Sequence, residues 1–116
     1  MKILLVDDNE DIRKMLRRKF KKTKWEIIEA VNGLEGVELA FQHQPDLILM
    51  DMHMPVLDGH EATKRLREQG YTGKIAALTA SVMRTQSHEA LENGCDYFIA
   101  KPITKDFIEQ IRKILE

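Results

Sequence analysis

Four of the five apolar runs in this sequence end on side chains that could bind or transfer a phosphoryl group. The runs read ILLV from residue 3, LILM from residue 47, IAAL from residue 75 and FIA from residue 98. The polar residues that close them are three carboxylates, a hydroxyl and an ammonium: Asp7, Asp8, Asp51, Thr79 and Lys101. Together, such groups can bind a divalent metal ion and hold a phosphoryl group.

The pattern between these residues predicts the elements that position them. Apolar runs of strand length alternate with helical patterns, which indicates repeated βαβ units and a parallel sheet. We expect strands near 2–6, 25–30, 46–50, 74–79 and 96–100, and helices near 10–22, 33–43, 60–69, 82–93 and 104–115. Functional groups in an open parallel sheet gather beyond the carboxyl ends of its strands. The five polar residues are therefore expected to share one crevice.

A few other residues predict where elements end and which strand lies at an edge. Asn32 and Asp58 each precede a helical pattern and have a glutamate three residues later, which is typical of helix N-caps. Gly70 stands where the third helix should end. The second strand contains Glu26 and Glu29, so we expect it at an edge of the sheet.

Length and composition bound the class of protein. The 116 residues are 43% hydrophobic and 32% charged, which suits a single globular domain spanning 1–116. No apolar run approaches a membrane span, and two acids follow the short first run, so the start is no signal peptide. The lone Cys95 forbids an internal disulfide and fits a reducing compartment. By elimination, we expect a cytoplasmic protein that does not bind a membrane.

Basic residues concentrate in one short stretch although the net charge is −1. The stretch, which we call the basic cluster, comprises Arg13, Lys14, Arg17, Arg18, Lys19, Lys21, Lys22 and Lys24. A solvated helix face is the favoured interpretation, and a docking surface for an acidic protein partner is the alternative. Direct nucleic-acid binding is not expected, because the chain as a whole is not basic. Met15, inside this stretch, is expected in the core, with a partner-facing position as the alternative.

The chemistry of the acids predicts a metal ion. Three carboxylates in one crevice repel one another, and a hard divalent cation relieves this repulsion. Mg²⁺ is the expected ion, with Mn²⁺ as an alternative. An aspartate can also act as a nucleophile toward phosphorus and form an aspartyl-phosphate. The competing interpretation, in which these acids merely cap helices and turns, explains each residue singly but not the set.

Four motifs together resemble the CheY-like receiver domain of two-component response regulators. They are D-D at 7–8, D-M-H-M-P-V-L-D-G from residue 51, A-L-T-A from residue 77 and A-K-P-I from residue 100. The resemblance covers essentially the whole chain, in order and with normal spacing. It implies an α/β fold with a five-stranded parallel sheet in the flavodoxin-like order 2-1-3-4-5, flanked by five helices.

The resemblance also implies roles for the acids. Asp51 would accept a phosphoryl group from a phosphohistidine on a sensor histidine kinase or a histidine phosphotransfer protein. Asp8, Asp51 and the backbone carbonyl of His53 would bind Mg²⁺ directly. Asp7 would act mainly through a metal-bound water. The chain would catalyse its own phosphorylation and dephosphorylation, but it would not be an enzyme with a separate substrate.

Further residues acquire roles only through the resemblance. Thr79 and Lys101 would contact the phosphoryl group, and the peptide bond before Pro102 is expected to be cis. Thr79 would be coupled to the aromatic switch residue Phe98, whose neighbour in the strand should face the other side of the sheet. Phosphorylation would repack the surface around the fourth helix, fifth strand and fifth helix and so control an output protein of unknown identity.

Two positions near the phosphoacceptor could tune how long the phosphoryl group lasts. His53 lies two residues beyond Asp51, and Ser81 lies two residues beyond Thr79. The resemblance assigns both to the rate of aspartyl-phosphate hydrolysis. The alternative is that they are solvent-facing side chains with little effect.

Other functions fit the sequence less well. An aspartate-nucleophile phosphatase needs a second acid two residues after the nucleophile, where this chain has His53. A flavin or nucleotide module needs a glycine-rich loop after the first strand, where this chain has two acids. A binding module that is never phosphorylated would not require every signature position to be filled. The H-E pairs lack the second histidine of a zinc protease, because Lys64 and Glu92 occupy its place.

Overall fold

The computed structural model describes residues 1–52, 54, 57–79, 94–100, 103 and 105–116. Its strands are β1 (Lys2–Val6), β2 (Glu26–Ala30), β3 (Leu47–Asp51), β4 (Lys74–Thr79) and β5 (Tyr97–Ala100). The helices among the described residues are α1 (Glu10–Phe20), α2 (Gly33–His43), α3 (Gly59–Glu68) and α5 (Phe107–Leu115). The helix predicted near 82–93 lies outside the described residues. The other predicted elements are confirmed: three have the predicted boundaries, and the boundaries of the rest differ by at most three residues.

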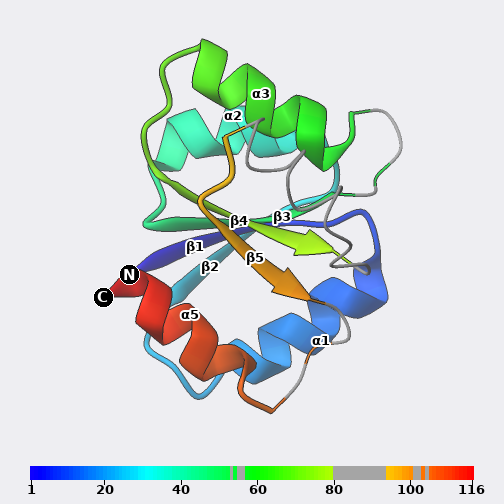
Figure 1. Ribbon diagram of the computed structural model, residues 1–116. Coiled ribbons are helices and arrows are strands. Elements are labelled where there is room, and N and C mark those ends of the chain that lie inside the picture. The colour runs from blue at the N-terminus through cyan, green and yellow to red at the C-terminus, as the bar shows by residue number, and fades with distance from the viewer. Residues whose placement is uncertain (53, 55–56, 80–93, 101–102, 104) are drawn as a thin grey trace.

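The five strands form one parallel sheet in the order β2-β1-β3-β4-β5. This confirms the predicted fold class and places β2 at an edge, as its two acids indicated. Helices α2 and α3 cover one face of the sheet, and α1 and α5 cover the other (Figure 1). Among the described residues, no helix is both long enough and apolar enough to cross a bilayer.

Two hydrophobic clusters, one on each face of the sheet, explain the continuous apolar runs. Leu4, Val6, Ile48 and Met50 pack with α2 and α3, whereas Ile3, Leu5, Leu47 and Leu49 pack with α1 and α5. Successive strand residues point to opposite faces, so a strand covered on both faces must be apolar at every position. All four residues of β3 before Asp51 are fully buried.

Side-chain caps fix where the helices begin. Asn32 accepts a hydrogen bond from the Glu35 backbone N–H at 2.8 Å, and Asp58 accepts one from the Glu61 N–H at 2.9 Å. Both predicted N-caps are therefore confirmed. Gly70, just after α3, has a φ of 90°, a conformation that glycine adopts without steric cost.

The prediction that Met15 lies in the core is wrong. Its side chain on α1 is 38% exposed, whereas the adjacent Leu16 is fully buried. The buried face of α1 passes through Leu16 and Phe20, and the next residue along a helix is rotated by about 100° from its neighbour. Met15 therefore lies beside the buried stripe instead of on it.

Candidate functional site

The carboxyl ends of β1, β3, β4 and β5 lie side by side, and Asp7, Asp51 and Thr79 lie at this end of the sheet. Val6 of β1 pairs with Met50 of β3, so Asp7 and Asp51 follow at the same level. Asp51 in turn pairs with Leu78, the residue before Thr79, in β4. Thr79 pairs with Ala100 of β5. The register of a parallel sheet thus gathers side chains that are far apart in the sequence.

The three acids form a compact group, which we call the acid cluster: Asp7, Asp8 and Asp51. Each offers a carboxylate oxygen, and these oxygens all lie within 4.8 Å of one another. Asp7 is fully buried, Asp51 is 4% exposed, and Asp8 is exposed. The convergence predicted from the sequence is therefore confirmed for these three acids.

The spacing of the acid cluster fits a hard divalent cation. With Mg²⁺–oxygen distances of 2.0–2.1 Å, ligands on opposite sides of a six-coordinate ion are about 4.2 Å apart. Oxygens within 4.8 Å of one another need shift only slightly to share such an ion, and waters can complete its shell. Mn²⁺ takes the same oxygen donors.

Local hydrogen bonds hold Asp7 at the end of β1. Its backbone N–H donates to the carbonyl of Ala30 in β2 at 3.2 Å. Its Oδ1 accepts from the backbone N–H of Asn9 at 2.9 Å. Asn9 is also the N-cap of α1, because its side chain accepts from the N–H groups of Asp11 and Ile12. The turn that carries the acids is thus tied to both the sheet and the first helix.

Asp58 and Gly59, which close the long motif, have structural roles close to Asp51. Asp58 caps α3, and Gly59 starts it. A Cβ on Gly59 would lie only 2.2 Å from the backbone oxygen of Asp51, so only glycine lets the helix come this close. The motif therefore fixes the approach of α3 to the end of β3.

Thr79 and Phe98 lie on the adjacent strands β4 and β5. Thr79 is the last residue of β4 and is 4% exposed. Phe98 is partly buried and packs on the cluster beneath α2 and α3, whereas Tyr97 packs on the opposite cluster. The predicted opposite orientation of these two rings is confirmed. Their response to phosphorylation remains a prediction.

Four predicted site residues lie outside the described residues. They are His53, Ser81, Lys101 and Pro102. Their assigned roles, including the cis peptide bond, therefore remain predictions.

Arg13 is a residue of this region that sequence reasoning missed. It was counted in the surface basic cluster, yet it is only 9% exposed. Its guanidinium donates a hydrogen bond from Nη1 to the backbone oxygen of Asp7. Its spacing from Leu16 and Phe20, three and seven residues, is the signal that could have placed it on the inward face of α1.

The other members of the basic cluster behave largely as a solvated helix face. Lys14, Arg17, Arg18 and Lys21 are exposed and line an open hollow of about 440 Å³. Arg17 also forms an ion pair with Glu29, with Nε and Oε2 3.2 Å apart. The alternative interpretation, docking of an acidic partner, stays a prediction.

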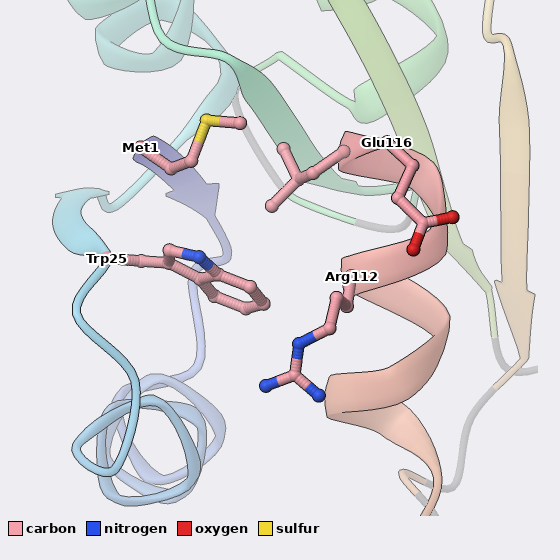
Figure 2. A pocket seen from close by; sticks show the side chains of 5 residues that line it. Met1, Trp25, Arg112 and Glu116 are labelled. Atoms are coloured by element: carbon pink, nitrogen blue, oxygen red, sulfur yellow. The ribbon is translucent and has the colours of Figure 1, made fainter.

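A second hollow lies away from the acid cluster. Its volume is about 200 Å³, and it is lined by Met1, Trp25, Arg112, Leu115 and Glu116. Figure 2 shows the Arg112 guanidinium facing the indole of Trp25, with 5.9 Å between its central carbon and the ring centroid. Met1 precedes β1, so this hollow is at the opposite end of the strand from the acids. The N- and C-termini of the chain lie next to each other there (Figure 1).

Comparison with known proteins decides the family. The sequence matches the response regulator receiver domain over residues 3–113. The chain belongs to this family. Receivers are signalling switches, so the chain is not an enzyme of the ordinary kind, and a histidine kinase or phosphotransfer protein is the implied partner class.

Individual relatives agree with this assignment over nearly their whole lengths. The polar-differentiation response regulator DivK of Brucella anthropi is 38% identical over an alignment that covers 97% of this receiver and 94% of DivK. The solved chemotaxis protein CheY4 of Vibrio cholerae superposes with a TM-score of 0.90 at 27% identity, covering 99% of this chain and 98% of CheY4.

A third relative bears on the metal. The receiver domain of a sensor histidine kinase from Pseudomonas aeruginosa has a TM-score of 0.88 at 29% identity, over 98% of this chain and 96% of that domain. Its structure has a magnesium ion coordinated in the active site cleft. Receivers bind Mg²⁺ at an acidic pocket, and this receiver has an acid cluster of matching chemistry.

Proposed function

We propose that this receiver is a phosphoacceptor switch in which Asp51 takes a phosphoryl group from a phosphohistidine of a sensor kinase or phosphotransfer protein. The observation that carries the proposal is the acid cluster: a buried Asp51 whose carboxylate lies within 4.8 Å of two further carboxylates. An aspartate-nucleophile phosphatase would need a second acid two residues after Asp51, where this chain has His53, and a nucleotide module would need a glycine-rich loop after β1, where it has two acids.

The transfer exchanges one bond to phosphorus for another. A carboxylate oxygen of Asp51 attacks the phosphorus atom, and the bond between phosphorus and the imidazole nitrogen of the donor breaks as the new phosphorus–oxygen bond forms. The electron pair stays on the imidazole nitrogen, which takes up a proton. The burial of Asp51 at the end of β3 holds its carboxylate in place for this attack.

Mg²⁺, or Mn²⁺ in its place, would be held by Asp8, Asp51 and the carbonyl of His53, with Asp7 alongside. When bound, it supplies positive charge next to the oxygens of the transferring group. In the same proposal, the Thr79 hydroxyl and the Lys101 ammonium contact those oxygens. The place of Thr79 at the end of β4, level with the end of β5, supports this role.

The signal would pass from Thr79 to Phe98 on the adjacent strand. An aspartyl-phosphate adds roughly 1.5 to 2 negative charges at Asp51, and Thr79 would move to meet one of its oxygens. That movement would leave space into which the ring of Phe98, which is only partly buried, would turn. An output protein that prefers the repacked surface of β5 and α5 would read the state. For a clean switch, the phosphoryl group must stabilise one conformation more than the other by several kcal/mol.

The remaining assignments belong to the same proposal. Residues 1–116 form one receiver unit, and His53 and Ser81 set the lifetime of the aspartyl-phosphate. A cytoplasmic location is supported by the free thiol of Cys95. Direct binding of nucleic acid or of a membrane is not part of this function.

Intact mass spectrometry after treatment with a small phosphodonor and Mg²⁺ tests the proposal. The wild-type chain should gain one phosphoryl group, and chelation with EDTA should prevent the gain. Asp51→Asn should abolish it, whereas the matched variant Asp106→Asn, which alters an exposed aspartate outside the acid cluster, should not. Steady release of phosphate from esters without a labelled protein would instead indicate a phosphatase.

A further inference from the structure

Arg13 is set apart from the rest of the basic cluster by its burial and its partners. It is 9% exposed. Its Nη1 donates to the backbone oxygen of Asp7, and its Nε lies 3.3 Å from Oε1 of Glu29 in β2. A charged group that is taken out of water is strongly destabilising unless it is paired and hydrogen-bonded, as this one is.

The carbonyl that Arg13 binds belongs to the peptide group between the first two acids of the cluster. Because this peptide group joins the α-carbons of Asp7 and Asp8, a displacement of it would shift both residues and their side chains. On its other side, Asp7 is held by its N–H bond to Ala30 and by the bond from Asn9 to its Oδ1. Arg13 therefore holds the peptide group that joins the two acids.

Glu29 aims the guanidinium of Arg13. Its carboxylate is 26% exposed and bridges two arginines, with Oε1 toward Arg13 and Oε2 3.2 Å from Nε of Arg17. Arg17 lies one turn further along α1, and its side chain is 48% exposed. The two arginines thus share a partner, but Arg13 is the one whose guanidinium is bonded to the turn that carries the acids.

We propose that Arg13 is a positioning residue for the metal-binding acids and that Glu29 orients it. The inference rests on the proposed function, because it requires the acid cluster to bind a divalent cation. The charge of Arg13 and its positioning role predict opposite effects of its removal on metal affinity. A guanidinium near the site repels a cation, so by charge alone its removal would strengthen metal binding. If Arg13 acts by fixing the peptide group, its removal weakens binding.

Metal affinity of the full chain separates these effects. Titration calorimetry with Mg²⁺, or Mn²⁺ binding followed by electron paramagnetic resonance, would compare the wild type with Arg13→Ala, Arg13→Lys and Arg17→Ala. Loss of a residue that orients metal ligands commonly lowers affinity 10- to 100-fold, and we expect about tenfold for Arg13→Ala. Arg13→Lys should also weaken binding, since a single ammonium lacks the planar fork that meets both acceptors. Arg17→Ala removes a charge from the same carboxylate and should leave affinity within about twofold, since exposed ion pairs contribute little.

Each result bears on the inference. Weaker binding in both Arg13 variants, with Arg17→Ala close to wild type, supports it. Binding by Arg13→Ala that equals or exceeds wild type overturns it while leaving the proposed function intact. A wild type that binds neither ion overturns both. Thermal unfolding in EDTA confirms that each variant is folded, and Arg13→Lys retains the charge if the alanine variant does not fold.

Discussion

Neutralising one acid of the cluster should stabilise the metal-free protein. At 4.8 Å, two unit charges repel by about 0.9 kcal/mol in water and by about 3.5 kcal/mol at an effective dielectric constant of about 20. Asp8 faces two such neighbours, and its own exposure places it toward the watery limit. We therefore expect Asp8→Asn to raise the free energy of unfolding in EDTA by about 1–2 kcal/mol, a gain in Tm on the order of 4 °C per kcal/mol.

Urea unfolding at low ionic strength measures this gain. Glu38→Gln is the control, because it removes one exposed acid on α2 that is not part of the cluster. In about 1 M KCl, where the screening length is near 3 Å, the gain should shrink. With Mg²⁺ present, the wild type should gain more stability than Asp8→Asn, because a ligand stabilises the state that binds it. An Asp8→Asn variant no more stable than wild type or the control would refute the mutual repulsion of the cluster.

Two substitutions and one labelling reaction test other parts of the structure. Gly59→Ala should lower the free energy of unfolding in urea by about 1–3 kcal/mol, because its Cβ would overlap the backbone oxygen of Asp51; unaltered stability would contradict that close approach. Burial, more than any other cause, raises the pKa of Cys95 to about 11, so its thiolate is scarce at pH 8. A maleimide should therefore react slowly with the native chain at pH 8 and rapidly in urea, and equal rates would count against the burial. Arg67→Ala should destabilise by about 2–3 kcal/mol and speed hydrogen exchange in β4, because Arg67 donates to three backbone carbonyls and to Asp96; exchange at the wild-type rate would show that these bonds are dispensable.

The sheet and the acid cluster could be predicted because their causes are local in the sequence. A strand covered on both faces must be apolar throughout, and β3 shows this in four consecutive buried residues. The parallel register then places the residues that follow each strand at the same end of the sheet. This is why Asp7 and Asp51 could be predicted to lie close together. Glu29 marked β2 as an edge strand, but it also serves as the partner of two arginines, a role that requires the packing of α1 to be known.

Residues whose environment depends on helix packing were harder to predict. Arg13 has the same charge as the residues around it, and only its spacing from Leu16 indicates that it faces inward. Met15 is apolar, yet its direction from the helix axis leaves it 38% exposed. Residue type alone would place Arg13 at the surface and Met15 in the core, the reverse of what the structure shows. Gln44 adopts a φ of 47° at the end of α2. The proline that follows indicates that the helix ends there, but it does not indicate this left-handed conformation.

Trapping the phosphorylated residue tests the central claim most directly. Borohydride reduces an aspartyl-phosphate to homoserine, and peptide mass spectrometry then identifies the position that carried it. After incubation with Mg²⁺ and a phosphohistidine donor, homoserine should appear at position 51 and should be absent when EDTA replaces the metal. Homoserine at another aspartate, or a phosphoryl group that survives the reduction as a serine, threonine or histidine adduct, would contradict the account.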